Sequence, residues 1–203
     1  GRAIPDALLL VSGKSAWMLA SPTYRKEAVG IPDVRYVESW DPWVGLSDLL
    51  EAEGIRRLAV QADQLTVAEW GRLKKETVCE VVDDGRLDEL LYRLNCVKSQ
   101  EEVEAVARAQ DIADRMFLEV LNYVHAGMSD WEVQRIVGVL LRDFGSQWDN
   151  YDHVMGVGVN TSMPHVRPNG TIIQPGDFVM LDVGGMVDGY GSDMTRVVDV
   201  GDG

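Results

Sequence analysis

An Asp-Gly pair between two apolar runs constrains the fold of this chain more than any other feature. Asp188-Gly189 lies between the runs 178–187 and 190–200. A type I′ turn needs positive φ at both central residues, and Asp-Gly adopts that conformation readily, so the sequence predicts a β-hairpin. The register that follows has three pairs: Val187 with Tyr190, Gly184 with Asp193, and Asp182 with Thr195.

This register brings two carboxylates to one face of the hairpin. Paired residues share a face and alternate residues repeat it, so Asp182 and Asp193 are expected to be diagonal neighbours with backbones roughly 7–8 Å apart. Gly184 leaves room for the carboxylate opposite it. Two inward carboxylates repel each other and lose solvation unless a cation lies between them. The alternative is a pair of solvated aspartates, but the Leu, Val, Met and Gly neighbours favour a buried hairpin and a metal site.

Composition excludes several classes of partner. The chain has 203 residues, enough for one large domain or two small ones, and its 46% hydrophobic and 26% charged residues are typical of a soluble globular protein. Its net charge of -14 disfavours nucleic acid and anionic membranes as partners. We see neither a membrane-spanning apolar stretch nor a secretory leader, so a cytoplasmic location is expected. Cys79 and Cys96 lack a CxxC spacing and are expected to be buried thiols.

Residues 1–95 alternate short apolar runs with helical patterns, which predicts a small α/β domain. A hairpin is expected around Gly13-Lys14. The other expected elements are strands over 34–37, 57–60 and 78–82 and helices over 46–53, 66–76 and 87–94. The scattered tryptophans Trp17, Trp40, Trp43 and Trp70 are interpreted as core or interface packing.

Residues 96–203 change character and predict an α+β domain, because two helices precede a set of antiparallel strands. Ser99 with Glu102, and Ser129 with Glu132, are capping boxes that open the helices. The expected apolar positions of the first helix are Val103, Val106, Ala113, Met116, Phe117, Val120, Leu121 and Val124. Those of the second are Val133, Ile136, Val137, Leu140, Leu141 and Phe144.

This second half resembles the creatinase, prolidase, aminopeptidase P and methionine aminopeptidase family, which has the pita-bread fold. The resemblance is carried by the stretches 98–102, 127–133, 160–165, 181–184 and 193–196. Residues 1–95 look like the smaller creatinase-type amino-terminal domain without its first elements. A domain of that type favours Xaa-Pro peptidases over methionine aminopeptidases.

The resemblance implies a site with two divalent cations, manganese first and cobalt or zinc as alternatives. The family's first two metal ligands fall on Asp182 and Asp193, and its pocket histidine, which contacts the scissile peptide, falls on His165. Hard carboxylate oxygens suit Mn²⁺, and a metal pair lowers the pKa of bound water. His153, on an expected strand, is assigned a structural role first and a place in the substrate pocket second.

The chain also departs from the family pattern. Family members supply one histidine and two glutamates as further metal ligands, all downstream of the second aspartate, and this chain has no His or Glu after Asp193. It opens without methionine and stops directly after an expected strand. We therefore interpret it as a fragment that lacks the second half of the catalytic domain, is inactive by itself and leaves its metal site empty or incomplete.

The leading hypothesis is a fragment of a dinuclear-metal Xaa-Pro peptidase, of the aminopeptidase P or prolidase type, that hydrolyses the bond before proline in short peptides. A homodimer is expected for the parent protein. One alternative is a creatinase-like amidinohydrolase acting on a small non-peptide substrate. Another is a non-catalytic pita-bread binding module, which the two retained aspartates and His165 disfavour. A half-domain that completes itself by dimerising ranks last, because two copies still lack the remaining ligands.

Overall fold

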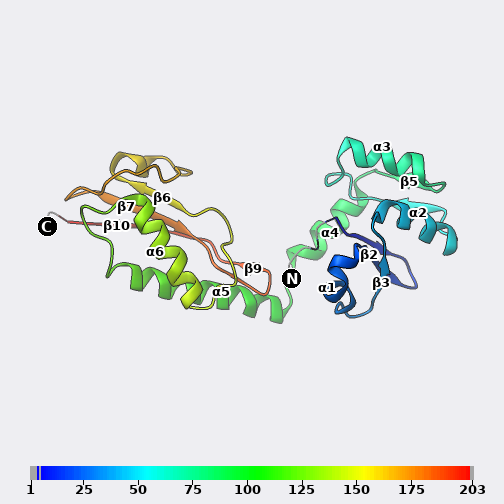
Figure 1. The fold of residues 1–203 in the computed structure, drawn as a ribbon, viewed down its shortest axis with the longest axis horizontal. Helices are drawn as coiled ribbons and strands as arrows, with labels where there is room; N and C mark the ends of the chain where they lie inside the picture. The colour runs from blue at the N-terminus through cyan, green and yellow to red at the C-terminus, as the bar shows by residue number, and fades with distance from the viewer. Residues whose placement is uncertain (1–3, 5, 202–203) are drawn as a thin grey trace. The chain divides into compact units, whose positions relative to one another are not determined.

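The computed structural model describes residue 4 and residues 6–201, which form two compact units. The first ends at Val97 and the second begins at Lys98. Figure 1 follows both along the chain, from blue strands to the orange and red strands of the second unit. Among the described residues, no helix combines the length and the apolar character needed to cross a membrane.

The first unit is α/β, with a three-stranded sheet in the order β1-β2-β3 and a separate parallel pair, β4 and β5. Its strands are β1 (Leu8–Val11), β2 (Ala16–Ala20), β3 (Val34–Glu38), β4 (Arg57–Ala59) and β5 (Glu80–Val82). Its helices are η1 (Pro22–Tyr24), α1 (Arg25–Val29), α2 (Pro42–Ala52), α3 (Val67–Glu76) and α4 (Arg86–Cys96). The predicted hairpin around Gly13-Lys14 is confirmed, since β1 and β2 pair antiparallel with Val11 opposite Ala16.

Helix α2 begins one turn earlier than predicted. Asp41 is its N-cap and accepts a hydrogen bond from the backbone N–H of Trp43, and Pro42 occupies the first turn, where its missing N–H costs nothing. Gly54 follows the helix with φ of 66°, the left-handed conformation that ends helices. Asp41-Pro42 therefore marks the start of the helix, and the prediction missed it because it relied on the spacing of apolar residues alone.

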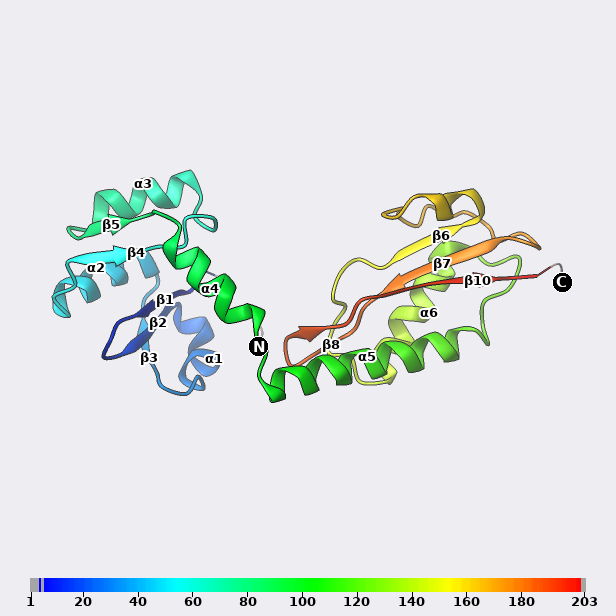
Figure 2. The same ribbon diagram turned by 180° about the vertical axis from the view of Figure 1, so that it is seen from behind.

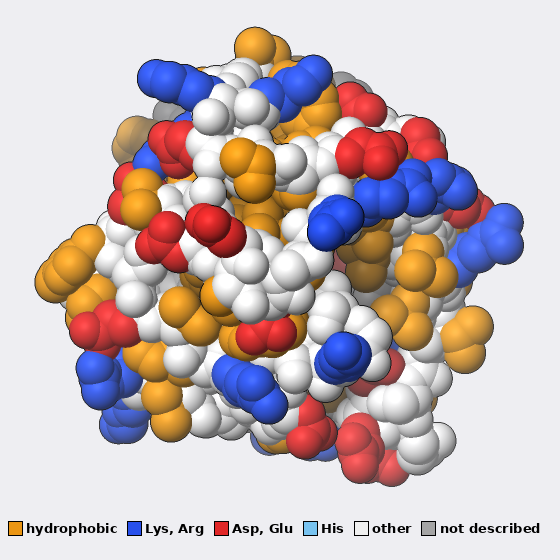
Figure 3. Space-filling model, turned by 90° about the vertical axis from the view of Figure 1, so that its right-hand side faces the viewer, with side chains coloured by type: hydrophobic (Ala, Val, Ile, Leu, Met, Phe, Trp, Pro, Cys, Tyr) orange, Lys and Arg blue, Asp and Glu red, His pale blue; other side chains and the backbone are white. Residues whose placement is uncertain are grey.

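The core of the first unit brings together residues of β1, β2, α2 and α3. Its buried members are Leu10, Trp17, Leu19, Leu46, Leu50 and Leu73. Trp17 belongs to this core as predicted, whereas Trp40 is 77% exposed. The expectation that both thiols are buried is wrong for Cys96, which is exposed in the last turn of α4. Figure 3 shows acidic, basic and apolar side chains interspersed on the face turned to the viewer.

The second unit is α+β and places two helices against an antiparallel sheet of order β10-β7-β6. Its elements are α5 (Gln100–Val120), α6 (Asp130–Asp143), β6 (Val154–Val157), η2 (Gly158–Ser162), β7 (Phe178–Val183), β8 (Met186–Val187), β9 (Tyr190–Gly191) and β10 (Met194–Asp199). Figure 2 shows α5 and α6 on the same side of this sheet. The core lies between them, where Val179, Leu181 and Val183 of β7 contact the helices.

Both helices begin at the predicted capping boxes. Ser99 and Ser129 each accept a hydrogen bond from the N3 backbone, and Glu102 and Glu132 reach back to the N-cap N–H groups. These reciprocal bonds satisfy N–H groups that a helix start otherwise leaves without partners.

The predicted apolar face of α5 is wrong in its first two turns. Val103 is 49% and Val106 38% exposed, whereas Ala105 and Ala109 are buried. The buried face begins with small residues because α5 lies close to the hairpin formed by β8 and β9 there. Further along, Ile112, Ala113, Met116 and Val120 are buried in the core.

Candidate metal centre

The predicted hairpin forms with the predicted register. Val187 pairs with Tyr190 at its tip, and Asp182 pairs with Thr195 further down. Asp188 and Gly189 have φ of 52° and 86°, so both central residues of the turn take the positive φ that a type I′ turn requires. The turn is held from outside by Arg108 of α5, whose guanidinium lies 2.8 Å from the Asp188 carboxylate.

The hairpin ladder is interrupted in the middle, where the backbone N–H of Ser192 still donates to the Gly185 carbonyl at 2.9 Å and Asn150 supplies further hydrogen bonds. One strand breaks at residues 184–185, between β7 and β8, and the other at residues 192–193, between β9 and β10. The backbone N–H of Asn150 donates to the Gly184 carbonyl at 3.0 Å, and its side-chain amide donates to the Ser192 carbonyl at 3.1 Å. The carbonyl groups of Gly184 and Ser192, one on each side of the interruption, therefore both accept hydrogen bonds from Asn150, which lies outside the hairpin.

Two glycines make that insertion sterically possible. A Cβ on Gly191 would lie 2.3 Å from Cγ of Asn150, and a Cβ on Gly184 would lie 2.1 Å from the Ser192 carbonyl oxygen. The same Cβ on Gly184 would lie 2.9 Å from Cε1 of Tyr151. Gly184 does make room, but for the Ser192 carbonyl, Tyr151 and Asn150 rather than for the Asp193 carboxylate that the sequence argument expected.

Tyr151 connects the two aspartates. Its hydroxyl oxygen lies 2.6 Å from Oδ1 of Asp182 and 3.0 Å from Oδ1 of Asp193. The two carboxylate oxygens can be no farther apart than those two distances laid end to end. Asp182 and Asp193 therefore point to one side of the hairpin and converge on one point.

The two carboxylates are not enclosed by the protein. Asp182 is partly buried and Asp193 is exposed, so the prediction of a buried hairpin holds for its apolar residues but not for the second carboxylate. Burial of the phenol, followed by its hydrogen bond to Asp182, raises the pKa of Tyr151 well above its ordinary value. The phenol therefore remains a proton donor toward the carboxylates throughout the physiological pH range.

A cavity of about 500 Å³ opens beside the carboxylates. It is lined by Tyr151, Asp152, Val154, His165, Arg167, Asp182 and Asp193. The structure thus brings the two predicted metal ligands and His165 to one cavity, together with a tyrosine, a third aspartate and an arginine. His165 is exposed, so its imidazole is available to a molecule in the cavity.

His153 lies on the other side of the sheet. Val154 pairs with Asp182 and shares its face, so alternation turns the neighbouring His153 toward the helices. Its side chain is 4% exposed, with Nε2 3.4 Å from the Gly184 carbonyl oxygen and 3.7 Å from Oδ1 of Asp149. Arg142 of α6 in turn contacts Asp149 at 2.9 Å. His153 is not among the residues that line the cavity.

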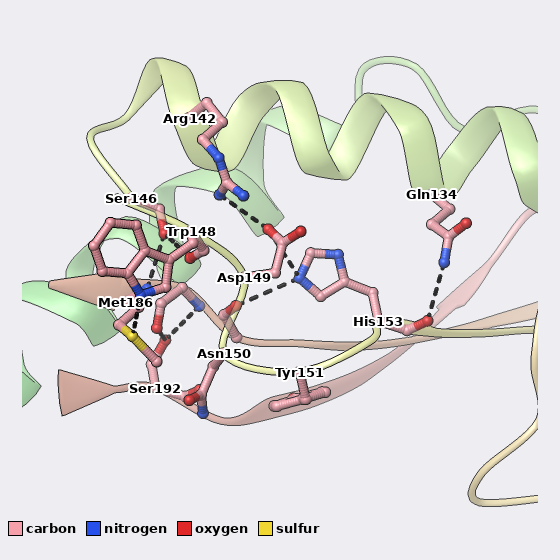
Figure 4. A network of polar contacts seen from close by, with 12 residues as sticks. Gln134, Arg142, Ser146, Trp148, Asp149, Asn150, Tyr151, His153, Met186 and Ser192 are labelled. Atoms are coloured by element: carbon pink, nitrogen blue, oxygen red, sulfur yellow. Dashed lines mark hydrogen bonds and ion pairs between the residues drawn. The ribbon is translucent and has the colours of Figure 1, made fainter. Parts of the chain in front are cut away.

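The segment 146–150 fastens the hairpin to the helices, as Figure 4 shows. The hydroxyl of Ser146 accepts a hydrogen bond from the backbone N–H of Met186 at 2.8 Å and donates to the Trp148 carbonyl at 2.7 Å. The backbone N–H of Gln147 donates to the Met186 carbonyl at 2.9 Å. This segment holds β8, near the tip of the hairpin, and thereby helps to position the strands that carry both carboxylates.

A buried carboxylate holds the loop that carries His165. Asp130, 1% exposed at the start of α6, accepts hydrogen bonds from the backbone N–H groups of Asn169 at 3.0 Å and Gly170 at 2.8 Å. The loop is joined to the helix start again by a 3.0 Å bond from the Asp130 N–H to the Thr171 carbonyl. A buried carboxylate needs such partners, so this loop and α6 are ordered together.

The donor set fits a hard divalent cation, but incompletely. Carboxylate oxygens are preferred by Mn²⁺ and similar ions, and two of them converge here. Within residue 4 and residues 6–201, no cluster of three or more His, Cys, Asp or Glu side chains is arranged to hold a metal. The described residues therefore offer two converging carboxylates rather than a complete cage.

Sequence reasoning missed four residues that line the cavity, namely Tyr151, Asp152, Val154 and Arg167. Tyr151 directly precedes a polar pair and the buried strand β6, and the pairing of β6 with β7 is what brings it to Asp182. A prediction that β6 and β7 are neighbours would have found it. Arg167 lies two positions after His165, so placing one in the cavity could have suggested the other.

Comparison with known proteins agrees with this architecture. Residues 104–203 match metallopeptidase family M24. A relative from Bacillus subtilis (strain 168), the uncharacterized peptidase YqhT, is 28% identical over 96% of this chain and 55% of its own length. A Xaa-Pro dipeptidase from Pyrococcus horikoshii is 24% identical over 95% of this chain and 53% of its own length. The chain thus spans about half the length of these relatives.

Solved structures give the same result. A Xaa-Pro dipeptidase from Bacillus anthracis superposes with a TM-score of 0.89 at 26% identity, covering 99% of this chain and 56% of that protein. An X-Pro aminopeptidase from Thermotoga maritima, with a TM-score of 0.86 at 21% identity over 95% of this chain and 53% of its own length, shares the fold. The predicted fold class, a creatinase-type α/β domain followed by the first half of an α+β pita-bread domain, is confirmed. On this sequence match and this fold, the chain is similar through its residues 104–203 to metallopeptidase family M24.

Proposed function

We propose that this chain supplies part of the active site of a dinuclear-metal Xaa-Pro peptidase, of the aminopeptidase P or prolidase type. The proposal rests above all on one observation, the convergence of Asp182 and Asp193 on the single hydroxyl of Tyr151. Two carboxylates that meet beside an open cavity repel each other unless a cation or a proton donor lies between them. The match of residues 104–203 to metallopeptidase family M24 supports the cation.

Each residue of the site has a distinct part in the proposal. Asp182 and Asp193 bind the cations through their carboxylate oxygens. Tyr151 donates its hydroxyl hydrogen toward both and keeps them converged. His165, which lines the same cavity, donates a hydrogen bond to the peptide carbonyl oxygen as negative charge develops there. A bound divalent cation pair would supply Lewis-acid chemistry at that carbonyl.

Further ligands must complete the cage, because two carboxylates alone hold a pair of cations weakly. We expect Mn²⁺ to be the physiological metal, with Co²⁺ or Zn²⁺ as substitutes, because the two donors described here are hard oxygens. We also expect a cytoplasmic homodimer that acts on short peptides containing proline. The relatives support the substrate, since several are Xaa-Pro dipeptidases or aminopeptidases.

A hydrolysis assay on the natural-length protein tests the proposal. The protein is stripped with a chelator, reloaded with Mn²⁺, and offered an Xaa-Pro dipeptide, an Xaa-Pro tripeptide and the corresponding Xaa-Ala peptides. Cleavage confined to the proline peptides is expected. Asp182→Asn and Asp193→Asn should each lower kcat/KM by about 100-fold or more, since even residues behind metal ligands cost 10–100-fold when changed.

Asp199→Asn is the matched control, because Asp199 ends the same strand, β10, and does not line the cavity. It should leave hydrolysis unchanged. Full activity of either Asp182→Asn or Asp193→Asn would contradict the proposed metal site. Creatine is offered in a parallel assay, and its cleavage in place of the proline peptides would replace the peptidase with an amidinohydrolase.

A further inference from the structure

His153 is a buried polar residue that the proposed chemistry does not use. Buried polar groups are normally hydrogen-bonded, so the partners of its imidazole indicate what the side chain does. Nε2 lies 3.4 Å from the Gly184 carbonyl oxygen and 3.7 Å from Oδ1 of Asp149. Both of these oxygens are acceptors, so Nε2 carries a hydrogen and donates it to Gly184, with the Asp149 carboxylate alongside.

The contact with Gly184 lies where regular strand pairing ends. The pairing of β6 with β7 stops at Val154, opposite Asp182. Beyond that pair, the Gly184 carbonyl accepts one hydrogen bond from the Asn150 N–H at 3.0 Å and one from His153. A carbonyl oxygen has two lone pairs, and these two donors use both. His153 therefore continues the connection between the two chain segments past the end of the ladder.

Helix α6 holds His153 in this position. Gln134 donates from Nε2 to the His153 carbonyl at 3.3 Å and so contacts its backbone. Arg142 lies 2.9 Å from Asp149 and holds that carboxylate beside the imidazole. Figure 4 shows the imidazole directed toward Asp149, with Arg142 and Gln134 extending from the helix. Both the backbone and the ring of His153 are therefore placed by the same helix.

The imidazole also contacts the tyrosine that connects the two carboxylates. The ring centroids of His153 and Tyr151 are 6.3 Å apart and the ring planes differ by 84°, an edge-to-face arrangement that aromatic pairs favour. We infer that His153 is a positioning residue of the metal site. It holds Tyr151 against the strand of Asp182 and thereby keeps the paired carboxylates converged on the Tyr151 hydroxyl. This inference rests on the proposed metal site.

The test compares the Mn²⁺ affinities of the chelator-treated, natural-length protein and its His153→Phe variant, measured by calorimetry. Phenylalanine keeps a ring but has no N–H, so the variant should bind Mn²⁺ about 10- to 100-fold more weakly, the usual cost of changing a residue behind metal ligands. His153→Gln keeps an N–H donor, and its affinity should fall between those two. Arg142→Gln should weaken binding less, and it should add nothing in His153→Phe because it acts through His153.

Val120→Ala separates positioning from a general loss of stability. Val120 is fully buried in the same core, but it ends α5 about 18 Å along the helix from Arg108, which contacts the hairpin turn. The variant should be less stable and yet bind Mn²⁺ with the parent's affinity at a temperature where both proteins are folded. An unchanged affinity in His153→Phe, or an equal loss in Val120→Ala, would overturn the inference.

Hydrogen exchange without a cation distinguishes failure of this inference from failure of the proposed function. In chelator-treated protein, backbone exchange over residues 149–153 should be about 2- to 10-fold faster in His153→Phe than in the parent, the range that one net hydrogen bond is worth. It should be unchanged in Val120→Ala. A parent protein that binds no Mn²⁺ would contradict the proposed metal site alone. Exchange at the parent's rate in His153→Phe would contradict the positioning role alone.

Discussion

The side-chain amide of Asn150 lies directly over the backbone of Gly191, with its Cγ 2.3 Å from where a Cβ of that residue would be. The amide sits at the break in the hairpin ladder and bonds to the Ser192 carbonyl at 3.1 Å. Ser192 directly precedes Asp193. A side chain from outside the hairpin therefore helps to hold the residue next to one proposed metal ligand.

Gly191→Ala should destabilise the second unit strongly, because the new Cβ would lie 2.3–2.4 Å from Cγ, Oδ1 and Nδ2 of the Asn150 side chain. Overpacking of this kind costs about 1–3 kcal/mol. Urea unfolding of the two proteins measures the difference. Gly138→Ala is the control, since Gly138 lies inside α6 with nothing within 4 Å of a Cβ. It should stabilise the protein by about 0.5–1 kcal/mol. Equal stability of Gly191→Ala and the parent would show that Asn150 moves aside freely.

Tyr151→Phe removes the one donor that both carboxylates share. In chelator-treated protein this should lower the free energy of unfolding by about 1.5–3 kcal/mol, the value of a hydrogen bond to a charged group. With Mn²⁺ present the difference should shrink, because a cation then neutralises Asp182 and Asp193 instead. Denaturant melts with and without the metal provide both values. A difference that is the same in the two conditions would mean that the hydroxyl and the cation do not act on the same carboxylates.

Acid should weaken the start of α6 through Glu132. The pKa of this carboxyl is lowered first by the backbone N–H of Ser129 and then by its hydroxyl. A carboxyl with a lowered pKa in the folded state stabilises the fold fully above its ordinary pKa of 4.5 and loses that contribution as the pH falls through the folded value. Glu132→Gln should therefore flatten the acid side of the stability curve, measured by urea unfolding between about pH 7 and pH 3.

Glu51→Gln, in the last turn of α2 and away from any capping box, should leave the shape of that curve unchanged. An acid limb that is as steep in Glu132→Gln as in the parent protein would remove Glu132 from the account of acid sensitivity.

The local features of the fold were predictable from sequence because their causes are local. The capping boxes at Ser99 and Ser129 depend on residues three positions apart, and the hairpin register depends on the Asp188-Gly189 turn. Each follows from backbone geometry that neighbouring residues dictate.

The rest depended on contacts that no local pattern encodes. Tyr151 reaches Asp182 and Asp193 across 31 and 42 positions of sequence, and it does so because β6 pairs with β7. The face of α5 was mispredicted because Val103 and Val106 are more apolar than the alanines that the hairpin requires there. Hydrophobicity favours large residues for a core, whereas close approach of two elements selects small ones.

Titration of chelator-treated, natural-length protein with Mn²⁺ tests most directly whether Asp182 and Asp193 bind cations at one shared site. Calorimetry would give the affinity of the parent, Asp182→Asn, Asp193→Asn and the double variant, with Asp199→Asn as the control. We predict that each single change weakens Mn²⁺ binding by about 100-fold or more and that the double variant is little weaker than either, because residues that share one partner are not additive. Losses that simply multiply in the double variant, or an unchanged affinity in either single variant, would contradict a shared site.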